Sequence, residues 1–66
     1  MKYFIIEIQK NQEGVYSHLI TTADTRKAAD AAYYGVLQYA ALSNLPLHTA
    51  CLLDETGLVY ANKSYQ

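Results

Sequence analysis

Two short polar turns, each ending in glycine, divide this chain of 66 residues and restrict the folds open to it. The turns, residues 11–14 and 54–57, each separate two runs rich in aromatic, β-branched and other apolar residues. Glycine readily takes the positive φ that tight turns need. The pattern predicts two β-hairpins, with strands over residues 3–9 and 15–22 and over residues 47–53 and 58–63.

An alanine-rich segment between the two hairpins, residues 25–43, has the periodicity of one amphipathic helix. Asp24 or Thr25 can cap its first turn, and Pro46 cannot continue it. Steps of 100° per residue give one apolar arc, which we expect to pack on a sheet: Ala28, Ala29, Ala32, Gly35, Val36, Tyr39, Ala40 and Leu42. Tyr33, Tyr34 and Leu37 fall on the opposite side or its margins.

The order of elements predicts a single α+β domain over residues 1–66, with a ββαββ topology. A right-handed crossover through the helix favours one four-stranded antiparallel sheet, with the second and fourth strands at its edges and the helix on one face. If four residues close each hairpin, Lys10 faces Val15 and Leu52 faces Val59. The helix is then expected to cover Phe4, Ile6, Ile8, Leu19, Leu52 and Val59.

The opposite face of this sheet is also apolar, although one helix can cover only one face. It is expected to carry Tyr3, Ile5, Tyr16, Ile20, Cys51, Leu53, Leu58 and Tyr60. An antiparallel sheet that faces water usually alternates with polar residues. The candidate interface therefore consists of Tyr3, Ile5, Tyr16, Ile20, Leu53, Leu58 and Tyr60, or of the helix edge with Tyr33, Tyr34 and Leu37. The alternative is apolar surface of the scattered kind that small proteins tolerate.

Self-association also fits the size of the chain. A domain this short buries only about 60% of the surface that its unfolded form exposes, so its stability is marginal. Cys51 is the single cysteine, which excludes an internal disulfide. We expect a non-enzymatic protein-interaction domain that forms a homodimer, or binds another protein, through a tyrosine-rich apolar surface.

Few residues suggest chemistry, and we expect neither catalysis nor a cofactor nor a metal. No glycine-rich phosphate loop is present. Glu7 and His18 are predicted to meet across the first hairpin, where a polar cross-strand pair is the ordinary outcome. His48 and Cys51, three residues apart on one strand, are expected to point to opposite faces, which argues against a nucleophile–base pair.

Nucleic-acid binding is the alternative function, since Tyr3, Tyr16 and Tyr60 on a sheet can stack on single-stranded bases. Such surfaces also need a basic groove, whereas the five basic residues here are scattered and outnumbered by six acidic ones. We therefore do not expect nucleic acid as the partner.

The start of the chain predicts a cytoplasmic protein with no membrane association. Its first apolar run, residues 3–6, stops at Glu7 and is shorter than the apolar core of a signal peptide, about 7–15 residues. A single free cysteine is consistent with a reducing compartment.

Several short motifs carry a resemblance that covers most of the chain. They are Tyr-Phe-Ile-Ile-Glu-Ile at residues 3–8, Ile-Thr-Thr at residues 20–22, Asp-Ala-Ala-Tyr-Tyr at residues 30–34 and Leu-Asp-Glu-Thr-Gly at residues 53–57. In this order they resemble small uncharacterised ββαββ proteins encoded by bacterial phages and by integrative and conjugative elements of Firmicutes. The resemblance implies a mobile-element origin and no functional residues.

Overall fold

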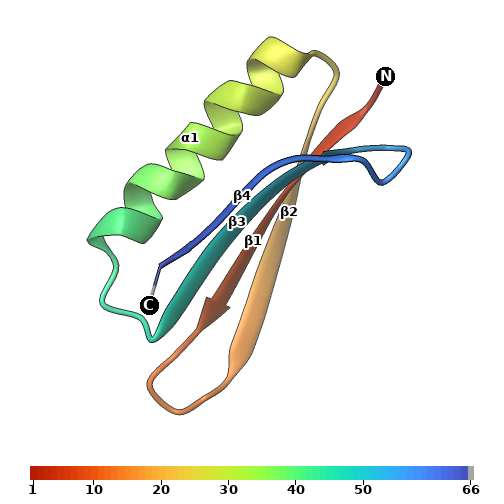
Figure 1. Ribbon diagram of the computed structural model, residues 1–66. Helices are drawn as coiled ribbons and strands as arrows, with labels where there is room; N and C mark the ends of the chain where they lie inside the picture. The colour runs from red at the N-terminus through yellow and green to blue at the C-terminus, as the bar shows by residue number, and fades with distance from the viewer. Residues whose placement is uncertain (66) are drawn as a thin grey trace.

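A computed structural model describes residues 1–65 (Figure 1). Its elements are β1 (Tyr3–Lys10), β2 (Tyr16–Ala23), α1 (Arg26–Leu42), β3 (Leu47–Asp54) and β4 (Val59–Tyr65). The strands form one antiparallel sheet in the order β2-β1-β3-β4, and α1 packs on one face of it. The predicted α+β class and ββαββ topology are confirmed.

The first hairpin is closed by five residues rather than four. Asn11 donates its backbone N–H to the Val15 carbonyl at 3.0 Å, and its Oδ1 accepts the Val15 N–H at 2.9 Å. Since Asn11 and Val15 are hydrogen-bonded to each other, the loop proper is residues 12–14. Gly14 takes a φ of 81°, as the last position of such a three-residue loop requires. Lys10 therefore faces Tyr16. The prediction that Lys10 faces Val15 is wrong by one residue, so each β1 side chain shares a face with the other set of β2 side chains from the one expected.

The second hairpin uses the same five-residue arrangement. Asp54 donates its backbone N–H to the Leu58 carbonyl at 3.0 Å, and its Oδ1 accepts the Leu58 N–H at 3.3 Å. Gly57 has a φ of 89°. The two hairpin turns are thus built alike, each with an Asn or Asp whose side chain holds the residue four positions later.

An irregularity in β4 follows the second turn. Leu53 faces Val59, but Leu52 faces Ala61, so Tyr60 is an extra residue without a partner on β3. This is a β-bulge. The predicted pairing of Leu52 with Val59 is wrong, because the five-residue turn and the bulge together move the partner of Leu52 two residues along β4.

The helix begins at the predicted cap. The Thr25 hydroxyl accepts the Ala28 N–H at 3.2 Å, which satisfies one of the free donors of the first turn. At the other end Ser43 caps the helix and donates its N–H to the Ala40 carbonyl at 3.2 Å.

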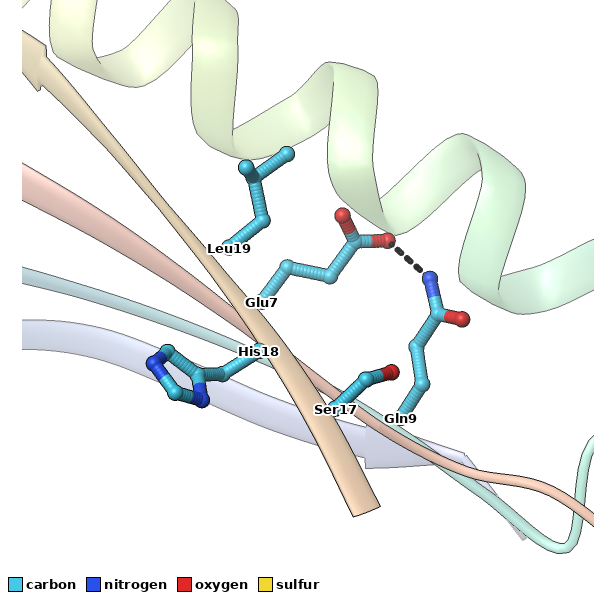
Figure 2. A pocket seen from close by; sticks show the side chains of 5 residues that line it. All are labelled: Glu7, Gln9, Ser17, His18 and Leu19. Atoms are coloured by element: carbon cyan, nitrogen blue, oxygen red, sulfur yellow. Dashed lines mark hydrogen bonds between the residues drawn. The ribbon is translucent and has the colours of Figure 1, made fainter. Parts of the chain in front are cut away.

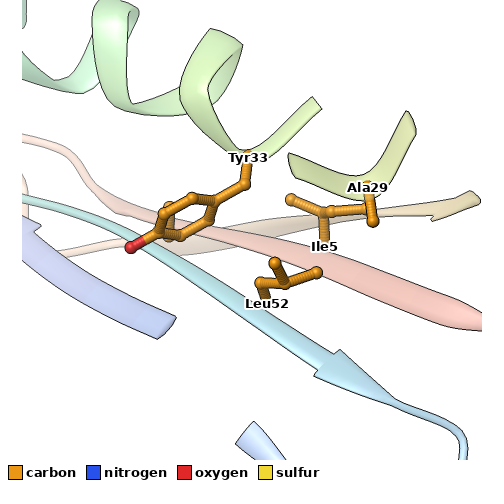
Figure 3. Packing of buried hydrophobic residues seen from close by; sticks show 5 residues of the cluster. Ile5, Ala29, Tyr33 and Leu52 are labelled. Atoms are coloured by element: carbon orange, nitrogen blue, oxygen red, sulfur yellow. The ribbon is translucent and has the colours of Figure 1, made fainter. Parts of the chain in front are cut away.

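The core lies between α1 and the two central strands (Figure 3). It contains Ile5 from β1, Ala29 and Tyr33 from α1, and Ala50 and Leu52 from β3. Ala29 and Ala50 are fully buried, and these small side chains bring the helix backbone close to the sheet.

The helix faces the sheet at a different rotation from the one predicted. Tyr33 is buried and Leu37 packs against the core, whereas Tyr39 and Leu42 are about three-quarters exposed. Ala28 is exposed as well. The predicted apolar arc is wrong in part because Tyr33 fills the core with one large ring. The many small residues spread around the helix do not indicate which side carries that ring.

The helix also covers the other face of β1 from the one predicted. Tyr3 and Ile5 contact the core, and Phe4, Ile6 and Ile8 therefore point away from the helix. Val59, opposite Leu53, lies on the uncovered face too. Leu52 is covered as expected, but Leu19, on the helix side, stays 61% exposed because α1 lies mainly over β3 and β1.

Candidate functional site

The face of the sheet opposite α1 is called the open face below. Strand register and the alternation of side chains assign its residues. Its central part consists of apolar side chains from β1 and β3, namely Phe4, Ile6, Ile8, Cys51 and Leu53. Around them lie Lys10, Tyr16, His18, Ile20, Thr22, Leu47, Thr49, Val59, Asn62 and Ser64. An apolar centre with a mostly polar periphery is the usual anatomy of a protein interface.

Charge is nearly absent from the open face. Lys10 and His18 are its basic residues, and none of the six carboxylates of the chain is among its residues. Glu7 and Asp54 lie on the helix side, and the others are in turns or in and before α1. In residues 1–65 no element packs on this face (Figure 1).

The structure divides the predicted interface residues between several places. Ile5 and Tyr33 are in the core, and Tyr3 and Leu37 pack against it, so these four do not form a surface. That part of the prediction is corrected, because the first hairpin is shifted and the helix is rotated. Tyr16, Ile20 and Leu53 lie on the open face. Tyr34, Leu58 and Tyr60 are exposed elsewhere, on the helix, in the second turn and at the bulge.

The open face is therefore not rich in tyrosine. Tyr3 and Tyr60 lie against each other on the helix side, with ring centroids 5.9 Å apart, and the Arg26 guanidinium covers the Tyr60 ring at 4.2 Å. Of the three tyrosines in the predicted base-stacking platform, Tyr16 alone lies on the open face. The sequence analysis does not predict that Phe4, Ile6 and Ile8 lie on the open face. A five-residue first turn would have given the register that places them there.

A buried polar cluster lies on the helix side, where β1 meets β3. Glu7 Oε2 and His48 Nε2 are 2.5 Å apart, and Gln9 Nε2 donates to the same carboxylate oxygen at 3.1 Å. The side chains of Glu7 and His48 are only 15% and 6% exposed. His48 Nδ1 is buried without a hydrogen-bond partner in the described residues. The predicted pairing of Glu7 with His18 is wrong, since His18 lies on the open face (Figure 2).

A pocket of about 120 Å³ borders this cluster (Figure 2). Its lining residues are Glu7, Gln9, Ser17, His18 and Leu19. Ligand pockets usually measure roughly 300–1000 Å³, so this one is too small to hold a substrate of ordinary size. Glu7 lines this pocket but His48 does not, so the pocket does not bring both members of the pair to one reactant.

Asp54 holds the second turn together. Its Oδ1 accepts from the Thr56 hydroxyl at 2.5 Å and from the Thr56 N–H at 2.8 Å, and its Oδ2 accepts from the Tyr60 hydroxyl at 2.7 Å. These hydrogen bonds to the charged form lower the pKa of Asp54 to about 2. The same contact raises the pKa of Tyr60. The groups that donate to Asp54 come from the turn and from the start of β4 directly after it, which indicates a structural role.

Other chemistry finds little support in the described part of the chain. His48 and Cys51 point to opposite faces of β3, as expected. Residues 1–65 contain no cluster of three His, Cys, Asp or Glu side chains that could hold a metal ion. Within the same range α1 is too short and too polar to cross a membrane.

Comparison of the chain with protein-family models, with curated proteins and with solved structures finds no match.

Proposed function

We propose that this chain is a non-enzymatic protein-interaction domain that self-associates by packing the open face of one copy against the open face of another. The single observation that supports this most is the uncovered apolar centre of the sheet, with Phe4, Ile6 and Leu53 on the side away from α1. Contiguous apolar surface of this kind usually marks an interaction site.

The open face is large enough for such a contact. Four strands about 4.8 Å apart and eight residues of about 3.3 Å each give a face of roughly 500 Å². A biological interface buries at least about 1000 Å² in total, or about 500 Å² from each partner. The total accessible surface of the chain is 4439 Å², so the open face is a substantial share of it.

A second copy fits this surface better than a charged partner. The open face carries no carboxylate and has Lys10 and His18 near its margins, so it offers little complementarity to an acidic or a basic surface. Two apolar faces whose few charges lie near the margins can instead pack as the inner layers of a β-sandwich. A mobile-element accessory role, which the sequence resemblance implies, is part of the proposal.

The test is the solution mass of the Ile6→Lys variant, because Ile6 lies at the centre of the open face between Ile20 and Cys51. We expect the wild type to self-associate with rising concentration and Ile6→Lys to lose this contact while keeping its helical circular dichroism. Val59→Lys, at a more exposed position of the same face, serves as a second variant.

Tyr39→Lys is the matched control, since Tyr39 lies on the outer side of α1 and is 74% exposed. It should associate like the wild type. A wild type that stays monomeric at millimolar concentration, or an Ile6→Lys variant of unchanged mass, would refute the open-face contact.

A further inference from the structure

β2 is an edge strand whose two faces and outer edge are all exposed. Residues 16–22 are all exposed, including Leu19 on the helix side at 61% and Ile20 on the open face at 52%. Figure 1 shows β2 along the margin of the sheet, beside β1, and α1 contacts β2 less than it contacts β1 and β3. Its outer side has no strand partner in the described chain.

This edge lacks the devices by which proteins block strand pairing. Natural edge strands are protected by lysine, proline, bulges or inward-pointing charges. β2 has the sequence Tyr-Ser-His-Leu-Ile-Thr-Thr-Ala, with no lysine, proline or carboxylate, and its register with β1 is regular over eight pairs. The opposite edge, β4, contains both a bulge and Lys63.

The hydrogen-bond ladder fixes which backbone groups of β2 point outward. Asn11 and Val15 form a hydrogen-bonded pair, and the register continues with Gln9 opposite Ser17 and Glu7 opposite Leu19. Since hydrogen-bonded and non-hydrogen-bonded pairs alternate, odd-numbered residues of β2 point their N–H and C=O groups toward β1. The outward groups therefore belong to Tyr16, His18, Ile20 and Thr22.

We propose that two copies of the chain join along β2 in antiparallel orientation, with the two-fold axis at Leu19, to form one continuous eight-stranded sheet. This axis pairs His18 with Ile20 and Tyr16 with Thr22 of the other copy, so outward groups meet outward groups. Such pairing supplies about eight backbone hydrogen bonds, from four pairs with two bonds each. Leu19 meets the Leu19 of the other copy as a non-hydrogen-bonded pair, in which side chains approach most closely.

A second copy is the occupant that this edge matches best. A two-fold axis through a residue always sets even-numbered residues opposite even-numbered ones, which is the match that the outward groups require. It also places both helices on the same side and covers Leu19, which α1 leaves exposed. The two open faces then become one surface of twice the area, so this contact adds to the open-face contact and does not compete with it.

A cysteine at the axis tests the geometry directly. In a Cys51→Ala background, Leu19→Cys places two thiols opposite each other across the axis, with Cα atoms about 4.5 Å apart. This distance suits a disulfide. Mild oxidation is expected to give a covalent dimer in high yield. Thr21→Cys is the matched control, because Thr21 would lie opposite Ser17 of the other copy and should crosslink poorly.

A proline at the outward N–H tests the hydrogen bonds. His18→Pro removes a donor that β1 does not use, whereas His18→Ala removes the same side chain and keeps the donor. We expect the His18→Pro variant to lose the β2 contact and to have a lower solution mass than the wild type. The His18→Ala variant should keep the wild-type mass. Asn62→Pro makes the equivalent change on the outer side of β4 and should have no effect on mass.

The combination with Ile6→Lys separates the two contacts. If both exist, each single variant loses one contact and the double variant Ile6→Lys/His18→Pro is monomeric. If His18→Pro keeps the wild-type mass and the two cysteine variants crosslink equally, the β2 contact is refuted while the open-face contact stands. If Ile6→Lys has no effect on mass but His18→Pro is monomeric, the open-face contact is refuted while the β2 contact stands.

Discussion

Glu7 and His48 form a hydrogen-bonded pair beneath α1, with Glu7 Oε2 2.5 Å from His48 Nε2 and both side chains largely buried. Glu7 lies opposite Ala50 and His48 opposite Gln9, so the pair spans neighbouring strands diagonally. A charged residue on a short strand ordinarily marks the solvent side, and here it marks the covered side.

Removing one partner of this pair should cost more than removing both. Glu7→Leu leaves the His48 ring buried without its partner, which we expect to lower the free energy of unfolding by about 1–3 kcal/mol. The double variant Glu7→Leu/His48→Leu should be closer to the wild type, since apolar replacement of a whole buried pair is often neutral. Urea denaturation of the four proteins of this cycle measures the coupling. Strictly additive losses would contradict it.

Acid should weaken the second turn through Asp54. Its pKa of about 2 in the folded chain lies below the unfolded value of about 3.9, so its contribution is complete above about pH 4. As the pH falls from about 4 to 2, the unfolded chain binds the proton first and the contribution is lost. Asp54→Asn should have lower stability at pH 6 and a flatter decline over this window, as measured by urea denaturation at each pH.

The three glycines should respond differently to alanine. Gly14 and Gly57 have φ values of 81° and 89°, so alanine there is expected to destabilise the fold by about 1 kcal/mol. Gly35 is in α1, and a Cβ added to it would meet no atom within 4 Å. Gly35→Ala should therefore stabilise the chain, by up to about 1 kcal/mol. Thermal unfolding of the three variants provides the comparison, and a loss of stability in Gly35→Ala would contradict the open space beside this residue.

Two adjacent alanines of α1 test the rotation of the helix. Ala29 is fully buried against the sheet, so Ala29→Leu is expected to overpack the core and cost about 1–3 kcal/mol. Ala28 is exposed, and Ala28→Leu should change stability by less than about 0.5 kcal/mol. Equal effects in denaturant unfolding would mean that the helix faces the sheet at another angle.

The sequence predicts the elements of this fold well because each has a local cause. Thr25 caps the helix, and Gly14 and Gly57 sit where a positive φ is needed. These signals act within a few residues of the chain, and the structure places them where the sequence analysis expects them.

Assignment of the two faces depended on a finer detail. The side chains of Asn11 and Asp54 hold the residue four positions later, so each turn closes one residue beyond its glycine. The sequence of β1 cannot reveal that shift, because β1 has isoleucine on both faces and either register would place isoleucine under the helix. On the covered face Glu7 also contacts His48, 41 positions away in the sequence, and no local pattern reveals this long-range contact.

The bulge at Tyr60 has a consequence for changes in chain length. Leu53 pairs with Val59 and Leu52 with Ala61, so deleting Tyr60 would join two stretches of ladder that already agree on which side chains face the helix. A deletion farther along β4, with the bulge kept, would reverse the faces of all residues beyond it. The fourth strand therefore contains one position at which a residue can be lost without a change of register, at the expense of the Tyr60 hydrogen bond to Asp54.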